Sequence, residues 1–223
     1  MGKRSMDILL AGSLSLLALP VIVIAAVLIR LDSAGPVLFR QRRMGRHFTP
    51  FYLLKLRTMR ANPGGPAITL GDDPRITRVG RWLRRSKIDE LPQLWNVLSG
   101  EMSMVGPRPV IPELAAEFRY HYRRLLAVRP GLTDPATLKY CREVELLSQV
   151  PDPLRHFMTV VTPDKLRISA AYLHRACLWT DLCVLVQTLL ALIAPRWGRG
   201  SYLPETPRPV LSAAPLLSEE PAP

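Results

Sequence analysis

Two adjacent carboxylates, Asp89 and Glu90, are the residues whose type and spacing best suit chemistry. They precede the run LPQLWNVLSG, whose apolar spacing predicts a helix that ends at Gly100. Pro92 fits the first turn of that helix and leaves both carboxylates at its entrance. Alternatively, Ser86 and Asp89 form a capping pair and Pro92 bends a longer helix. In both arrangements the backbone amides of the helix N-terminus favour anions, whether carboxylate or phosphate.

Arginines lie on both sides of this pair. Residues 76–86 predict a helix with one apolar face. Its other face carries Arg75, Arg78, Arg81, Arg84 and Arg85. Arg108 lies between prolines in the run GPRPVIP, so its guanidinium loses little freedom when it binds a phosphate. In the simpler interpretation Asp89 only caps the helix while Glu90 and the arginines are solvated, and the residues alone leave both interpretations open.

The composition points to a membrane surface. The chain has 223 residues, a net charge of +12 and 48% hydrophobic residues, which suits one ordinary domain or two small ones and excludes a disordered chain. Ten basic but only two acidic residues fall within residues 1–60, around the most apolar stretch. This combination favours an anionic membrane over nucleic acid. Three scattered cysteines without a CxxC pair exclude a disulfide scaffold, disfavour a zinc site and fit a reducing cytosol.

The apolar stretch lies between Asp7 and Arg30 and holds 22 uncharged residues. As a straight helix of about 33 Å it could span a bilayer. Pro20, near its centre, removes a backbone hydrogen bond and bends a helix, and basic residues at both ends favour keeping both ends on the cytoplasmic side. A helix that breaks at Leu19–Pro20 and leaves by the face it entered satisfies both observations. A single span is the alternative, and the residues alone favour neither.

The remainder predicts a mainly helical α+β domain. Runs of β-formers at 37–39 and 51–54 predict a small β-hairpin, and residues 62–74, rich in Gly, Pro and Asp, predict a loop. The apolar segment 172–194 is interrupted by polar side chains and predicts an amphipathic helix that packs on the domain or lies at a membrane interface. The proline-rich residues 195–223 predict a disordered tail.

The run DPRITRVGRWLRRSKIDELPQLWNVLSGEMSMVGPRP, residues 73–109, resembles the signature of bacterial sugar transferases. These are monotopic phosphoglycosyl transferases, which load a sugar phosphate onto a polyprenyl phosphate. The resemblance extends to YLLKLRTM at 52–59, RPGLTD at 129–134 and TPDKL at 162–166. It covers roughly residues 3–190 and matches the short members, which consist of a membrane hairpin and a catalytic domain.

The resemblance implies a reaction and roles for named residues. Asp89 matches the nucleophile that attacks the β-phosphorus of a UDP-sugar and expels UMP, and Glu90 matches its partner associated with Mg²⁺, so both are candidate metal ligands. Undecaprenyl phosphate then takes the sugar phosphate from the aspartate. The arginines and lysine that match positions near the substrate phosphates or in other motifs of the family are Arg84, Arg108, Lys55, Arg57 and Arg129.

The resemblance also implies an organisation. It favours a re-entrant membrane hairpin at 1–35 and a cytosolic catalytic domain at 36–194, followed by the tail at 195–223. The expected place is the cytoplasmic face of the bacterial inner membrane, in contact with its lipid, and the sequence is compatible with a homodimer. Two departures stand out: Leu19 precedes the central proline where the family often has Ser, and PATLKYCREVELL follows RPGLTD. The second departure leaves the sugar unidentified.

A function of another class is a membrane-anchored basic scaffold or anionic-lipid-binding module without chemistry. A second alternative is a catalytically silent homologue that acts as a scaffold, and the intact Asp89-Glu90 pair argues against it. Aromatic residues make up only 7% of the chain and form no stacking pattern among the basic residues, which argues against nucleic acid as a partner.

Overall fold

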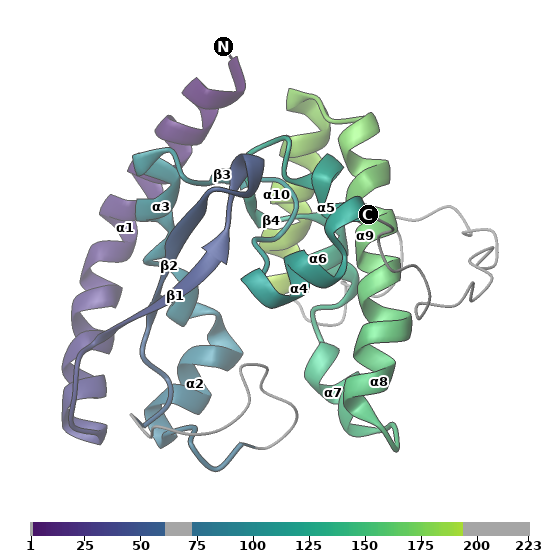
Figure 1. Ribbon diagram of the computed structural model, residues 1–223. Helices are drawn as coiled ribbons and strands as arrows, with labels where there is room; N and C mark the ends of the chain where they lie inside the picture. Colours follow the sequence, from purple (N-terminus) through teal and green to yellow (C-terminus); the bar gives the residue numbers. More distant parts are fainter. Residues whose placement is uncertain (1, 61–72, 194–223) are drawn as a thin grey trace.

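The computed structural model describes residues 2–60 and 73–193. Most of the predicted loop at 62–74 and the predicted tail at 195–223 lie outside the described residues. The described part is mainly helical, with two small two-stranded sheets, as the sequence predicts for an α+β domain (Figure 1).

The predicted β-hairpin is present and longer than expected. Strands β1 (Leu38–Met44) and β2 (Pro50–Leu56) pair antiparallel, with Leu38 opposite Leu56 and Met44 opposite Pro50. A short 3₁₀ turn, Arg46–Phe48, joins them. The buried side chains of β2 pack into the core, so one face of the hairpin is fixed on the domain.

The structure of the N-terminal helix contradicts the prediction of a break at Leu19–Pro20. Helix α1 runs without interruption from Gly2 to Asp32 and includes Pro20, although Figure 1 shows its axis changing direction along its length. A proline lacks only the hydrogen bond to the carbonyl four residues earlier, and a bend relieves its steric clash. Because Ala18 and Ala25 pack on the domain on either side of Pro20, the contacts hold the two halves together as one helix.

A narrow stripe of α1 faces the domain. Its buried residues are Asp7, Ala11, Ala18, Ala25 and Ile29. Their spacings of four and seven residues place them on one side of a helix. The small alanines allow close approach to helices α2 (Arg78–Ser86) and α3 (Gln93–Ser99) and to strand β3 (Ser103–Val105). Most of the other large apolar side chains of α1 are exposed, so this helix is both a wall of the core and a large exposed apolar surface.

A second small sheet crosses the centre of the domain. Strand β3 pairs in parallel with β4 (Gly131–Thr133), Ser103 opposite Gly131 and Val105 opposite Thr133. Just beyond β3, Gly106 lies so close to Gly131 that a Cβ on either glycine would meet backbone atoms at 3.1 Å or less. This contact fixes the start of the loop that carries Arg108.

Short helices complete the domain after this sheet. They are α4 (Pro112–Glu117), α5 (Arg119–Leu125), α6 (Pro135–Lys139), α7 (Glu143–Ser148) and α8 (Pro153–His156). A π-helical turn, Phe157–Val161, leads into α9 (Thr162–His174), and α10 (Leu178–Ile193) follows. Helix α10 buries Asp181 and Val184 and exposes its other face, which agrees with the predicted amphipathic helix, although Tyr172 belongs to α9.

Two side chains of α1 attach it to the distant end of the chain. Lys3 forms an ion pair with Asp181 of α10, and Asp181 also accepts a hydrogen bond from the hydroxyl of Tyr172. Asp7 accepts hydrogen bonds from the Ser103 hydroxyl at 2.9 Å and from the Met104 amide at 3.0 Å. The membrane-type helix is therefore tied by buried polar contacts to the strand that precedes the Arg108 loop.

Candidate active site

The two carboxylates lie in a short turn between α2 and α3. Lys87 ends α2 in the left-handed conformation, with φ of 59°, and Ile88–Glu90 then form one 3₁₀ turn before α3 begins after Pro92. Of the two arrangements that the sequence allows, the structure has the short helix with the carboxylates at its entrance. The Ser86–Asp89 capping pair does not form, because the Ser86 hydroxyl donates to the carbonyls of its own helix.

Glu90 is held between two cations from distant elements. Its Oε1 lies 3.2 Å from Nζ of Lys55, on β2, and 2.7 Å from Nη2 of Arg108, in the loop after β3. Burial opposes ionisation of Glu90, but the charges of Arg108 and Lys55 outweigh it and hold the pKa of this carboxyl well below its usual range. Glu90 is therefore an anion that orients both cations.

Asp89 has the opposite surroundings. The residue is only 7% exposed, and its Oδ1 is buried without a hydrogen-bond partner among the described residues. Burial raises the pKa of this carboxyl, and the positive charge of Lys55 offsets part of that effect. A poorly solvated carboxylate oxygen with no donor bound to it is available to attack an electrophile or to bind a cation.

Arg84 reaches the same site from the last turn of α2. Its Nε donates a hydrogen bond to the Thr58 hydroxyl at 2.8 Å. Burial lowers the pKa of Arg84, while the negative charge of Asp89 acts to raise it, so the two groups lie close enough to interact. The close contact depends on Gly80, where an added Cβ would lie 2.0 Å from the carbonyl oxygen of Thr58.

Arg43 is a member of the site that was missed in the sequence. From β1 it donates to Gln41 Oε1 at 2.7 Å and to the carbonyl of Pro109 at 3.4 Å. Burial, together with the nearby charge of Arg108, lowers its pKa to about 10. The register places Arg43 opposite Phe51 and therefore on the buried face of the hairpin. The run RQRRMGR contains four arginines, and only the alternation and register of the strand show that Arg43 is the one that faces the domain.

Arg57 and Arg129 contact other parts of the chain. The Arg57 guanidinium donates to the carbonyls of Ser33 and Ala34, just after α1. Arg129 donates from Nε to the carbonyl of Gly100 at 2.8 Å, at the end of α3. The structure does not bring either side chain into contact with Asp89 or Glu90; both stabilise backbone segments that flank the site.

The charges of the site suit an anion such as a phosphate. Several cations act electrostatically on the two carboxylates, so positive charge is in excess. The cations are Arg43, Lys55, Arg84, Lys87 and Arg108. Clustered arginines and a lysine in a partly buried site bind phosphate oxygens strongly. The geometry therefore places a buried carboxylate oxygen without a donor beside a group of cations that can bind phosphate oxygens.

Comparison with known proteins shows the family to which the chain belongs. The family model described as bacterial sugar transferase matches residues 1–195. Over 209 residues the chain is 39% identical to the UDP-glucose:undecaprenyl-phosphate glucose-1-phosphate transferase of Caulobacter vibrioides, which covers 86% of this chain and 69% of that protein.

Two further relatives widen the comparison. The chain is 44% identical over 153 residues to the exopolysaccharide production protein PSS of Rhizobium leguminosarum, covering 63% of this chain and 74% of that protein. It is 34% identical over 197 residues to the UDP-glucose:undecaprenyl-phosphate glucose-1-phosphate transferase of Escherichia coli, covering 84% of this chain and 39% of the relative.

Proposed function

Because this chain belongs to the bacterial sugar transferase family, we propose that it carries out the family's reaction with Asp89 as its nucleophile. The protein transfers a sugar 1-phosphate from a UDP-sugar to undecaprenyl phosphate, a step that initiates the synthesis of an exopolysaccharide or another glycan. The names of its relatives include glucose, galactose and N-acetylgalactosamine, so the donor sugar is a matter for experiment.

In the first half-reaction, a carboxylate oxygen of Asp89 forms a bond to the β-phosphorus of the UDP-sugar. The bond between this phosphorus and the bridging oxygen breaks, and UMP leaves with that oxygen and its electron pair. The product is a sugar-phosphoryl aspartate. The buried position of Asp89 favours this step, because its carboxylate loses little hydration when it attacks.

In the second half-reaction, a phosphate oxygen of undecaprenyl phosphate attacks the same phosphorus. The bond to Asp89 breaks, and the aspartate regains its carboxylate. The acceptor leaves as undecaprenyl diphosphate sugar. One nucleophile thus serves both steps, and the donor and acceptor occupy the same phosphate site in turn.

The cations around Glu90 bind and orient the phosphates. Arg108 and Lys55 share one oxygen of Glu90, which leaves their remaining N–H groups free to donate to phosphate oxygens. Arg84, which interacts electrostatically with Asp89, and Arg43, which interacts with Glu90, extend this set. Because the protein holds these donors in place before substrate binds, they stabilise the charge that develops on the phosphorus and on UMP without reorganising.

The residues also fit Mg²⁺. Mg²⁺ binds one or two carboxylates and completes its shell with water and substrate phosphates. Oδ1 of Asp89, buried and unpartnered, together with the neighbouring Glu90 provides such a pair. No group of three or more potential ligands occurs within residues 2–60 and 73–193, which agrees with an ion shared with the diphosphate. When bound, the ion would neutralise charge on the diphosphate and the departing UMP.

The observation that carries this proposal is the contrast between the two carboxylates: Glu90 bound by Lys55 and Arg108, and Asp89 buried with a free oxygen. The test is UMP release by the full chain in lipid nanodiscs, with Mg²⁺ and a panel of UDP-sugars. Without undecaprenyl phosphate, wild type should release UMP up to one equivalent of enzyme, and with it turnover should continue. Asp89→Asn should release none in either case. Full turnover by this variant, or UMP release that always requires the acceptor, would contradict the proposal.

We also propose that the protein is monotopic on the cytoplasmic face of the inner membrane. Helix α1 is long and apolar enough to cross a bilayer, but its buried stripe lies against the domain from Asp7 to Ile29. A helix crossing the bilayer would draw the charged domain into the hydrocarbon. An α1 that lies shallowly, with its exposed apolar face in lipid, avoids this cost.

Cysteine labelling tests this topology. Single cysteines are introduced at Ser5 and Ala34, near the two ends of α1, in a chain whose three native cysteines are replaced. In inside-out membrane vesicles both positions should react with a membrane-impermeant maleimide. Protection of one end alone would support a single span instead.

A further inference from the structure

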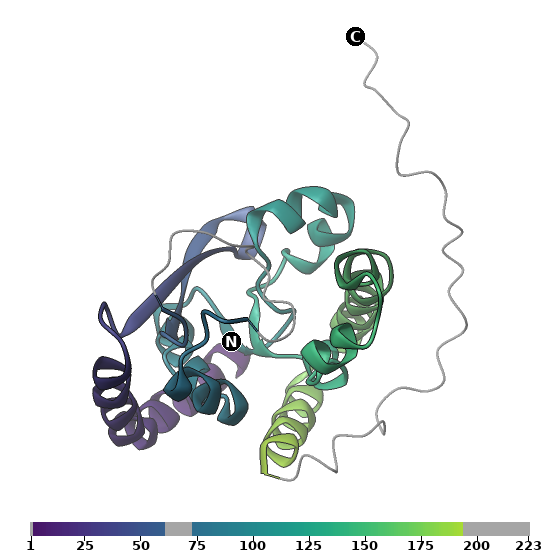
Figure 2. The same ribbon diagram turned by 90° about the horizontal axis from the view of Figure 1, so that it is seen from below.

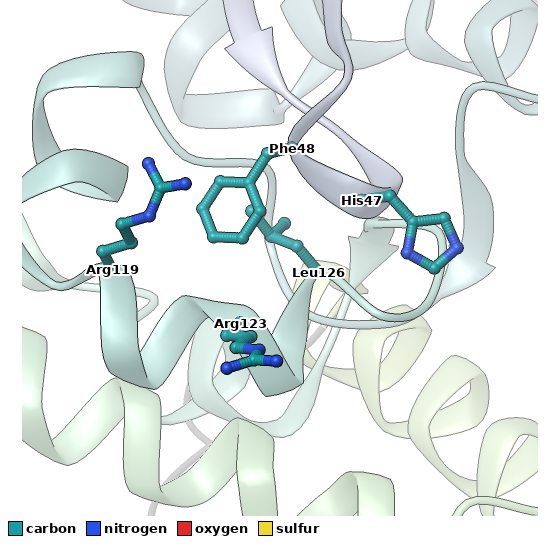
Figure 3. A pocket seen from close by; sticks show the side chains of 5 residues that line it. All are labelled: His47, Phe48, Arg119, Arg123 and Leu126. Atoms are coloured by element: carbon teal, nitrogen blue, oxygen red, sulfur yellow. The ribbon is translucent and has the colours of Figure 1, made fainter.

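A pocket outside the catalytic site lies at the turn of the β-hairpin. It has a volume of about 350 Å³ and is formed by His47 and Phe48 of the turn, by Arg119 and Arg123 of α5, and by Leu126 (Figure 3). In Figure 3 the Phe48 ring lies between Arg119 and Leu126, with Arg123 on the helix below and His47 at the opposite rim. None of these residues belongs to the site around Asp89.

The turn that forms one wall is strained. His47 and Phe48 are consecutive non-glycine residues with φ of 56° and 59°. Such left-handed residues are unfavourable for side chains with a Cβ and persist where the surroundings hold them, often at binding sites. Here the His47 amide donates to the carbonyl of Leu126 at 2.6 Å and Arg46 Nε donates to the carbonyl of Ala127 at 3.2 Å. The hydrogen bonds thus fix the turn against the end of α5.

The charge of this pocket is positive and lacks a carboxylate partner. Arg119 and Arg123 are one helical turn apart, so their like charges repel each other. Within the described ranges, neither arginine forms an ion pair. The two walls come from stretches of sequence, 33–60 and 118–133, that contain no Asp or Glu. An anion from solution would relieve the repulsion.

One of the arginines is already oriented. The Arg119 guanidinium carbon lies 5.3 Å from the centre of the Phe48 ring. A guanidinium stacked on an aromatic ring keeps its N–H edge free for a bidentate contact with a phosphate. The Phe48 ring, which the strained turn holds in place, therefore orients the Arg119 guanidinium so that it can bind an oxyanion.

The position of the pocket favours a soluble ligand over a lipid headgroup. In Figure 2, α4, α5 and the hairpin turn lie at the upper edge of the molecule, whereas α1 and α10 lie at the lower edge. Most of the exposed large apolar side chains belong to α1 and α10, although Tyr120 of α5 is exposed as well. A membrane in contact with those two helices is on the other side of the protein from the pocket.

We propose that this pocket binds a small soluble molecule carrying a phosphate group, with Arg119 and Arg123 as its phosphate ligands. The pocket is connected to the catalytic site through β1. Arg43 lies four residues before His47, and the amide of the next residue, Met44, donates to the carbonyl of Val110 at 2.8 Å, close to Arg108. The turn is therefore linked to Arg43 along strand β1 and to the segment near Arg108 through the Met44–Val110 hydrogen bond.

The test is calorimetric titration of the full chain in nanodiscs with inorganic phosphate and with glycerol 3-phosphate. Arg119→Ala and Arg123→Ala should each weaken the binding of both probes by roughly tenfold or more, because each removes a charge-assisted contact. Arg124→Ala, on the same helix but outside the pocket, is the matched control and should bind like wild type. Arg108→Ala weakens phosphate binding at the catalytic site, so the titrations are repeated in this background, where binding at the pocket should persist and should still be weakened by Arg119→Ala.

Two results would overturn the proposal. One is wild-type affinity in both pocket variants, and the other is loss of all phosphate binding in Arg108→Ala. A second arm measures co-sedimentation with phosphatidylglycerol vesicles, which should be the same for wild type and both pocket variants. Weaker vesicle binding together with unchanged phosphate affinity would assign the arginines to lipid and likewise refute the proposal. None of these readouts depends on catalytic turnover, so they remain informative even if the proposed reaction is wrong.

Discussion

At the scale of single residues, the two neighbouring carboxylates of the candidate site differ in the side chains that contact them. Lys55 and Arg108 both contact Glu90, and Asp89 is left with a buried oxygen that has no donor. One carboxylate therefore orients the cations, while the other keeps an oxygen without a donor, as the proposed nucleophile requires. The carboxylate pair and the cations Lys55, Arg84 and Arg108 could be predicted from the sequence. Which carboxylate Lys55 and Arg108 contact could not, because that depends on contacts between β2 and the loop after β3.

The raised pKa of Asp89 predicts a pH-dependent change in stability. The folded protein holds a proton on this carboxyl more tightly than the unfolded chain, so wild type loses stability as the pH rises through the pKa of folded Asp89. Asp89→Asn carries no such charge. We expect it to unfold at a higher temperature than wild type at pH 7, with a difference that shrinks as the pH falls toward the usual pKa of an aspartate. Thermal unfolding from pH 4 to 8 measures this, with the exposed Glu117→Gln as control. A variant less stable than wild type at pH 7 would refute the assigned environment.

Arg43 gives the second prediction at this scale. Removal of one charge-assisted contact to phosphate costs about 1.5–3 kcal/mol, so Arg43→Ala should lower kcat/KM for the UDP-sugar by roughly ten- to a hundredfold. Arg43→Lys should recover part of it. The exposed Arg42→Ala, on the other face of the same strand, is the matched control and should remain near wild type. Equal kinetics for Arg42→Ala and Arg43→Ala would remove Arg43 from the site.

At the scale of secondary-structure elements, the site depends on how closely α2 approaches the end of the hairpin. Thr77 caps α2 by accepting a hydrogen bond from the Gly80 amide, and its own amide donates to the carbonyl of Thr58. The hydroxyl of Thr58 then accepts from Arg84. Thr58, which follows β2, thus sets both the position of α2 and the direction of the Arg84 side chain.

Gly80→Ala tests this approach. The added methyl would lie 2.0 Å from a backbone oxygen, so α2 must shift, at a cost of about 1–3 kcal/mol in stability and with displacement of Arg84. We expect a lower unfolding temperature and reduced UMP release. Gly12→Ala is the matched control, because nothing lies within 4 Å of its Cβ position and alanine favours a helix by up to about 1 kcal/mol. An unchanged Gly80→Ala variant would show that the contact is dispensable.

Elements with a clear local pattern were predictable from the sequence. The β-hairpin, the helix at Arg78–Ser86 and the helix that ends at Gly100 all occur close to their expected places. The continuous course of α1 through Pro20 was not predictable, because local chemistry at a proline favours a break. The contacts of Ala18 and Ala25 with the domain decide the matter, and these arise only after distant segments have packed.

At the scale of the whole molecule, α1 belongs to the domain core. Ala11 and Ala18 share one hydrophobic cluster with Leu94, Val97 and Met102 of the domain. The polar contacts of Lys3 and Asp7 bind the same helix to α10 and β3. The sequence could indicate a membrane segment from its hydropathy, but not the side of that segment which faces protein.

Substitutions on the two sides of α1 test this packing. Ala11→Leu inserts bulk where the side chain is fully buried, and should destabilise the protein by about 1–3 kcal/mol in detergent. Leu16→Ala, on the exposed apolar side, should leave the unfolding temperature nearly unchanged. Thermal unfolding in detergent micelles compares them. Identical behaviour would mean that α1 is an independent anchor in solution.

The alanine stripe of α1 has a consequence for the engineering of the protein. A segment that serves only as an anchor can be exchanged for any other of similar hydrophobicity, or trimmed to obtain a soluble enzyme. Here such a chimaera or truncation would expose Val97 and Met102 and release Ser103 and Met104 from Asp7, only a few residues before Arg108. We therefore expect an exchanged N-terminal helix to keep the enzyme stable only when the residues that it contacts in α3 and β3 are exchanged with it.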